Sequence, residues 1–233
     1  MPTVSLPPRA ALLLDLDGTL LDFAPTPDAV IVPDGLIADL RAIRARLGDA
    51  LAIVTGRPIA QVDALLGDAP YAVAGEHGTA LRFAPGVPIQ KIPLPALPGG
   101  WADRAIAAAA HHAGALYEPK AHGFVLHFRQ VPDAGPALQA AALDILDQHK
   151  DFMLMPASMA WEAKPIAVDK GAAVRALMAA PPFAGRTPIY VGDDVTDLDG
   201  IAAAVALGGM GWQVAPVFGS PAGVRAWLHG LAR

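Results

Sequence analysis

Cysteine is absent from this sequence of 233 residues, and so is any excess of positive charge. Without cysteine the chain forms neither disulfides nor thiolate metal sites, and its composition fits a reducing compartment. Lysine and arginine number 17 against 22 aspartate and glutamate residues, so the net charge of −5 lacks the basic footprint of a nucleic-acid-binding protein. We therefore expect a cytoplasmic protein without a nucleic-acid partner.

A long uninterrupted apolar run is also missing near the N-terminus. Asp15 and Asp17 break the apolar stretch there, and Arg9 is the only cation before it. We therefore expect neither a signal peptide nor a membrane span, and no membrane partner. What the chain has in quantity is apolar residues, at 54% of the sequence against 17% charged, which is typical of a well-packed globular protein.

Strand and helix patterns alternate over much of the chain. Short apolar runs predict buried strands at 11–16, 50–57 and 71–78. Apolar residues three or four apart predict intervening helices at 33–48 and 58–67. The alternation resumes near Lys164, with helices predicted at 169–179 and 221–232 and strands at 187–197 and 203–209. The pattern predicts an α/β fold with a parallel sheet that is covered by helices on both faces.

The middle of the chain has a different pattern. Residues 81–100 are rich in proline and glycine and predict a hairpin followed by a linker. An α-β-β-α-β-β order follows, at 101–113, 114–120, 123–131, 137–150 and a strand pair within 152–164. We therefore predict an α/β core made of residues 1–95 and 164–233, interrupted by a smaller α+β cap domain at 96–163. Two domains joined by such a linker are expected to move relative to each other.

Polar side chains gather where the predicted core strands end. They are Asp15 and Asp17 after the first strand, Thr55, Gly56 and Arg57 after the second, Glu76 and His77 after the third, and Asp193, Asp194 and Asp197 after strand 187–197. Lys170 begins the helix after the insert. Ligands of such sheets bind beyond the carboxyl ends of the strands, so we expect these residues to form one site.

The acids in this set indicate a metal ion and a reaction. A buried carboxylate is costly without a compensating cation, and Mg²⁺ binds carboxylate oxygens and bridges them to a substrate phosphate. We predict Asp15, Asp17, Asp193 and Asp194 as its ligands. An ionised Asp15 would attack phosphorus to form an aspartyl-phosphate, while Asp17 would protonate the leaving oxygen and then take a proton from water.

Thr55 and Lys170 complete the predicted catalytic set by holding the phosphoryl oxygens.

Each motif also has an ordinary structural explanation. Asp-x-Asp is commonly a turn or a helix cap, and residues 193–197 could cap the next helix. The joint placement of four such elements in one α/β scaffold favours the catalytic interpretation.

These motifs resemble those of the haloacid dehalogenase-type phosphohydrolases. "DLDGT", "IVTGR", Lys170 in "DKG" and "GDDVTD" match the family's four motifs, and a cap inserted between the second and third resembles its C2 class. Within that class "GEHG", "YEPKAHGFVLHFR" and "WEAKP" are similar to the trehalose-6-phosphate phosphatases. The resemblance implies Mg²⁺-dependent hydrolysis of trehalose 6-phosphate. One position departs from the family pattern, because Leu198 follows "GDDVTD" where the family usually has glutamate.

The predicted substrate contacts come from both domains. The resemblance implies that Glu118, Lys120 and Glu162 of the cap bind the sugar hydroxyls. Period-two alternation also places charged residues of the cap strands, Arg129 among them, on one face. The full predicted substrate-binding set is Gly56, Arg57, Glu76, His77, Glu118, Lys120, Arg129 and Glu162.

Other functions remain open from the sequence. The substrate could be a different sugar phosphate, such as sucrose phosphate or mannosyl-3-phosphoglycerate, or the chain could be a non-catalytic sugar-phosphate sensor with the same fold. Asp17 argues against a sensor, because a sensor does not need an acid beside the nucleophile. We expect a small-molecule sugar phosphate as the partner and a monomeric protein.

Overall fold

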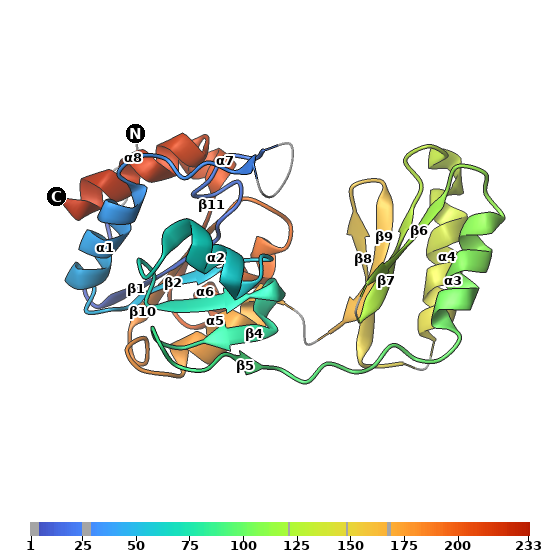
Figure 1. The fold of residues 1–233 in the computed structure, drawn as a ribbon, viewed down its shortest axis with the longest axis horizontal. Coiled ribbons are helices and arrows are strands. Elements are labelled where there is room, and N and C mark those ends of the chain that lie inside the picture. The colour runs from blue at the N-terminus through green and yellow to red at the C-terminus, as the bar shows by residue number, and fades with distance from the viewer. Residues whose placement is uncertain (1–4, 25–28, 121, 148, 167–168) are drawn as a thin grey trace. The chain divides into compact units, whose positions relative to one another are not determined.

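The structure is a computed structural model that describes residues 5–24, 29–120, 122–147, 149–166 and 169–233. It divides into two compact units (Figure 1): the core unit, Met1–Ile92 with Asp169–Arg233, and the inserted unit, Pro93–Val168. The predicted helix 137–150 includes residue 148, which lies outside the described residues. In the described part of the chain, no helix is long and apolar enough to cross a membrane.

One sheet runs through the core unit, and its seven described strands have the order β11-β10-β1-β2-β3-β4-β5. They are β1 (Ala10–Leu14), β2 (Leu51–Val54), β3 (Ala72–Gly75), β4 (Ala80–Arg82), β5 (Gln90–Lys91), β10 (Thr187–Gly192) and β11 (Met210–Gln213). The first five strands in this order pair in parallel, while β4 and β5 pair antiparallel at one edge. Strand β1 lies between β10 and β2, so segments on both sides of the insert meet at the centre of the sheet.

Helices cover both faces of this sheet, as the alternating pattern predicts. On one face lie α1 (Leu36–Arg46), α2 (Ile59–Leu66) and α8 (Pro221–Ala232); on the other lie α5 (Lys170–Met178) and α6 (Asp197–Ala206). Leu12 and Leu14 of β1 pack in the first core, and Leu13 packs in the second. Because both faces of β1 are buried, its sequence is continuously apolar. The predicted parallel α/β class is confirmed.

The inserted unit contains a separate antiparallel sheet in the order β6-β7-β9-β8 among the described residues. Its elements are α3 (Trp101–Ala110), β6 (Leu116–Lys120), β7 (Gly123–His127), α4 (Gly135–Leu146), β8 (Phe152–Ala157) and β9 (Ala160–Pro165). Phe124 and Leu126 of β7 pack against Trp101 and Leu138, so both helices cover the same face of the sheet (Figure 1). The observed α-β-β-α-β-β order matches the predicted order.

The strand prediction at 203–209 was wrong. Helix α6 continues through Ala206, and the strand β11 begins at Met210. Alanine is the strongest helix former, and the buried residues Gly200, Ala203 and Ala204 fall three or four apart, as on one face of a helix. The short helix α7 (Val214–Phe218) was not predicted.

Candidate active site

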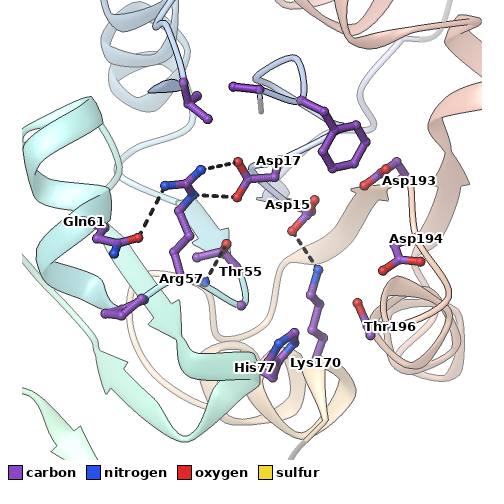
Figure 2. Close-up of a pocket in the computed structure, with 15 residues that line it drawn as sticks. Asp15, Asp17, Thr55, Arg57, Gln61, His77, Lys170, Asp193, Asp194 and Thr196 are labelled. Atoms are coloured by element: carbon purple, nitrogen blue, oxygen red, sulfur yellow. Dashed lines mark hydrogen bonds and ion pairs between the residues drawn. The ribbon is translucent and has the colours of Figure 1, made fainter. Parts of the chain in front are cut away.

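A cavity of about 450 Å³ lies at the carboxyl ends of the parallel strands. It is lined by nine of the residues that the sequence predicts for the site: Asp15, Asp17, Thr55, Gly56, Arg57, His77, Lys170, Asp193 and Asp194. In Figure 2, Asp15 lies between the pair Asp17–Arg57 and the acids that follow β10. Parallel strands bring their carboxyl ends to one edge of the sheet, and this brings together residues that are far apart in sequence.

The carboxylate of Asp15 is buried and is held at both oxygens. Lys170 Nζ donates to Asp15 Oδ1 at 2.7 Å, and Thr19 Oγ1 donates to Oδ2 at 3.1 Å. The backbone N–H of Asp15 donates to the Val191 carbonyl of β10 at 2.9 Å, continuing the strand pairing into the site. The plane of this carboxylate is therefore fixed by its neighbours.

The buried carboxylate of Asp197 is hydrogen-bonded both to Lys170 and to the turn after β10. Its Oδ1 accepts from Lys170 Nζ and from the Tyr190 hydroxyl, both at 2.6 Å. Its Oδ2 accepts from the backbone N–H groups of Asp193 and Asp194 at 3.1 and 3.0 Å. Gly192 leaves the space that this carboxylate fills, since a Cβ there would lie 2.2 Å from Asp197 Cγ. Asp197 therefore fixes both Lys170 and the turn after β10.

Burial dominates the protonation of these acids. It raises the pKa of Asp15 to about 8, although the ammonium of Lys170 acts in the opposite direction. Burial, with the charges of Asp197 and Asp194, also raises the pKa of Asp193. For Lys170, burial favours the neutral amine, but Asp15 and Asp197 together raise its pKa. Lys170 alone thus does not offset the cost of burying Asp15 in its ionised form.

Three carboxylates are arranged to fit a metal ion. Asp15, Asp193 and Asp197 each offer an oxygen atom, and these atoms lie within 4.8 Å of one another. Hard oxygen donors with excess negative charge are what a divalent cation requires. Both oxygens of Asp197 already accept two hydrogen bonds each, whereas Asp15 and Asp193 have acceptor capacity left. The residues present therefore fit a cation bound mainly by Asp15 and Asp193.

Two of the predicted metal ligands are engaged elsewhere. The carboxylate of Asp17 accepts from Arg57 Nε at 2.6 Å and from Arg57 Nη2 at 2.7 Å. Asp194 is exposed, and its Oδ1 accepts from the backbone N–H of Val195 at 2.6 Å. The metal-binding roles of Asp17 and Asp194 stay predictions.

The loops after β2 and β3 supply the opposite wall of the cavity. Thr55 Oγ1 accepts from the Arg57 backbone N–H at 3.2 Å, which leaves its own proton free to donate. Glu76 and His77 have φ of 52° and 55°, a conformation that is uncommon outside glycine. His77 lies against Gly56, where a Cβ would come within 2.6 Å of its ring, and it lines the cavity. Glu76 does not line it.

The predicted sugar-binding residues lie in the inserted unit. Glu118 of β6 and Glu162 of β9 both pair with Val125 of β7, so they share the sheet face away from the helices. His127 Nε2 bonds Glu118 Oε2 at 2.7 Å, and Lys120 Nζ donates to Glu118 Oε1. Both hydrogen bonds lower the pKa of Glu118, and the bond from Lys120 has the larger effect.

Arg129 follows β7, and its guanidinium donates to Ser158 Oγ at 3.2 Å. No hydrogen bond or ion pair joins it to Glu118, Lys120 or Glu162 among the described residues.

Several cavity residues were not predicted. Gln61 of α2 accepts from Arg57 Nη1 at 3.3 Å. Arg57 precedes the helix, so the four-residue rule for helical side chains gave no signal for this pair. Thr196 and Phe23 also line the cavity. Thr196 lies within the "GDDVTD" motif, but no sequence pattern distinguishes Phe23 from a core phenylalanine.

The split α/β core, its inserted α+β unit and the acids beyond β1 and β10 define a phosphatase of the haloacid dehalogenase type. A sequence model for trehalose-phosphatase matches residues 13–217. The chain belongs to the trehalose-phosphatase family, as its motifs predict.

Two curated relatives are named as trehalose-phosphate phosphatases. The chain is 40% identical to a probable trehalose-phosphate phosphatase of Sinorhizobium fredii, covering 88% of this chain and 78% of that protein. It is 36% identical to the trehalose-6-phosphate phosphatase of Escherichia coli, covering 91% and 80% of the two chains. A solved structure of Aspergillus fumigatus trehalose-6-phosphate phosphatase shares the fold, with a TM-score of 0.72 and 22% identity. The match covers 96% of this chain and 93% of that chain.

Proposed function

We propose that this chain is a Mg²⁺-dependent phosphatase that hydrolyses trehalose 6-phosphate to trehalose and inorganic phosphate. One observation carries the chemistry: the buried carboxylate of Asp15 stands at the end of β1, is held by Lys170 and Thr19, and lines the cavity. The substrate is inferred from the names of the relatives at 36% and 40% identity.

Asp15 is the nucleophile of the proposed reaction. An oxygen of its carboxylate attacks the phosphorus, the bond from phosphorus to the sugar oxygen breaks, and an aspartyl-phosphate forms. Lys170 has one N–H left after its bonds to Asp15 and Asp197, and Thr55 has its hydroxyl proton. Both donate to the phosphoryl oxygens, where charge spreads in the transition state.

Asp17 is the acid and base of the proposed reaction. It gives its proton to the departing sugar oxygen and then removes a proton from the water that attacks the aspartyl-phosphate. That second step releases phosphate and restores the Asp15 carboxylate. Because Arg57 holds both oxygens of Asp17, at least one of these bonds opens before Asp17 takes part in a proton transfer.

Asp15 and Asp193 would hold the Mg²⁺ ion, and Asp197 orients the turn that carries Asp193. When bound, Mg²⁺ supplies positive charge to the phosphoryl oxygens and offsets the negative charge of the site. The choice of Mg²⁺ over Zn²⁺ or Cu²⁺ is supported by the all-oxygen set of donors, which includes neither histidine nor cysteine among the grouped acids.

We assign sugar recognition to Glu118, Lys120 and Glu162. Carboxylates and an ammonium on one sheet face match the hydroxyl groups of a sugar, which both donate and accept hydrogen bonds. The hydrogen bonds from Lys120 and His127 keep Glu118 ionised and fix its orientation. Arg57 and His77, with the Gly56 backbone, are assigned to the substrate's phosphate end in the core unit, while substrate contacts of Glu76 and Arg129 stay predictions.

The proposal is tested by phosphate release from trehalose 6-phosphate, sucrose phosphate, mannosyl-3-phosphoglycerate and glucose 6-phosphate, with Mg²⁺ or with EDTA. We expect turnover of trehalose 6-phosphate that requires Mg²⁺ and is lost in Asp15→Asn. Asp199→Asn, an exposed acid in the first turn of α6, is the matched control. Preference for another sugar phosphate would overturn the substrate, and no metal-dependent turnover would favour a sensor.

A further inference from the structure

The chain has one strongly exposed aromatic ring, and it lies at the cavity. Among its seven phenylalanines, four tryptophans and three tyrosines, all of which the structure describes, Phe23 is 76% exposed and the others are buried or half-buried. Phe23 lines the same cavity as Asp15, Asp17 and Asp193. An apolar ring exposed beside polar catalytic groups indicates a surface that a ligand covers.

The segment that carries the acids holds the backbone that leads to this ring. The backbone N–H of Gly18 donates to the Leu21 carbonyl at 2.8 Å, and Leu20 and Leu21 are fully buried. Arg225 of α8 donates to the Leu20 carbonyl at 3.0 Å and pairs with Asp22 at 3.0 Å. The backbone on the N-terminal side of Phe23 is thus held in place, which lowers the entropy lost when a ligand binds to the ring.

Gly18 links the ring to the catalytic acids. A Cβ at Gly18 would lie 2.1 Å from Asp193 Oδ2 and 2.7 Å from Phe23 Cζ. The tip of the ring and the carboxylate of Asp193 therefore both lie against this glycine. A phosphate bound near Asp15 and Asp193 would bring the sugar that carries it close to the ring.

We infer that the ring of Phe23 stacks on the apolar C–H face of the sugar that carries the phosphate, which makes Phe23 a specificity-determining residue. This inference rests on the proposed function. A pyranose presents hydroxyl groups at its edge and C–H groups on its faces, and an aromatic ring has a negative face that attracts C–H groups. Stacking would orient the sugar without adding a charge beside Asp15.

The test compares Phe23→Ala with Phe23→Tyr on two substrates, trehalose 6-phosphate and acetyl phosphate, whose leaving group contains no ring. In Phe23→Ala we expect kcat/KM to fall about tenfold more for trehalose 6-phosphate than for acetyl phosphate, and Phe23→Tyr to restore the ratio. Val205→Ala, 55% exposed on α6 and outside the cavity lining, is the control and keeps the wild-type ratio.

Binding gives a second readout that is independent of turnover. In the Asp15→Asn background, calorimetry with trehalose 6-phosphate should show about tenfold weaker binding when Phe23 is also replaced by alanine. If the wild-type chain hydrolyses trehalose 6-phosphate, equal losses of kcat/KM on both substrates or an unchanged Kd in the Asp15→Asn background would overturn the stacking role alone. A wild-type chain that does not hydrolyse trehalose 6-phosphate would instead overturn the proposed function, and the stacking role with it.

Discussion

Arg57 holds the carboxylate of Asp17 with two bonds, from Nε to Oδ2 at 2.6 Å and from Nη2 to Oδ1 at 2.7 Å. The two residues follow neighbouring strands, and the guanidinium is largely shielded from solvent, with 11% of the side chain exposed. This planar two-bond contact aligns Asp17 beside the cavity without a metal ion. It also defines a resting position that the proposed acid–base step has to leave.

We predict that Arg57→Lys lowers kcat for trehalose 6-phosphate by about tenfold or more, because lysine cannot form the two-bond fork and leaves Asp17 less well oriented. Gln61→Leu is the matched control. It removes only the 3.3 Å contact to Arg57 Nη1, so we expect a loss of less than about threefold. Steady-state kinetics of both variants check this, and equal effects would contradict an orienting role for Arg57.

Mg²⁺ should stabilise the folded chain more at about pH 8 than at about pH 6. Burial raises the pKa of Asp15 from 3.8 to about 8, so between these values the metal-free folded state binds more protons than the unfolded state. The contribution of Asp15 to stability is therefore present at low pH and is lost as the pH rises through this window. Mg²⁺ binds the ionised carboxylate and offsets that loss.

Melting temperatures measured at both pH values, with Mg²⁺ and with EDTA, check this prediction. Asp193→Asn should abolish most of the gain, since it removes a predicted ligand. A gain that is the same at both pH values would show that the ion binds away from Asp15.

Glu118→Gln and Glu162→Gln should lower kcat/KM for trehalose 6-phosphate about tenfold or more, while hydrolysis of a small aryl phosphate falls much less. Neither side chain is part of the core unit that holds Asp15. Glu118 is 43% exposed, so loss of its pairs should change stability by only about 0–1 kcal/mol. Equal losses on both substrates would remove these residues from sugar recognition.

Tyr190→Phe should lower the free energy of unfolding by about 1–2 kcal/mol, because it removes a buried hydrogen bond to the charged Asp197. Asp197 Oδ1 keeps its bond from Lys170, so activity should persist. Tyr71→Phe is the control, since the hydroxyl of Tyr71 makes no hydrogen bond within the described residues. Urea unfolding of both variants measures the difference, and equal stability would contradict this role for the Tyr190 hydroxyl.

Much of the core was predictable because its signals are local. The apolar run of β1 is short and rich in leucine between polar residues, which favours a strand buried on both faces, and the polar residues that follow parallel strands meet at one sheet edge. Lys170 was found in the same way, from its position at the start of a helix. The stretch at 203–209 was misassigned because a short alanine-rich run fits either a helix or a buried strand.

What the sequence could not give is pairing between distant residues. Asp17 and Arg57 lie 40 positions apart, and no periodicity indicates that their side chains form two bonds. Asp197 was recognised as one acid of a cluster, but its four hydrogen bonds depend on the space beside Gly192 and on the Tyr190 hydroxyl. Phe23 was not predicted as a cavity residue, because exposure is a property of the fold.

The central place of β1 in the sheet has a consequence for synthesis of the chain. Strand β1 is made first, yet one of its two neighbours, β10, and the partner of Asp15, Lys170, come from beyond the insert. While the ribosome is still translating the inserted unit, β1 has an unpaired edge and Asp15 has no counter-charge. The surroundings of Asp15, the proposed nucleophile, can be completed only after β10 has been made, so the proposed catalytic site forms late in translation.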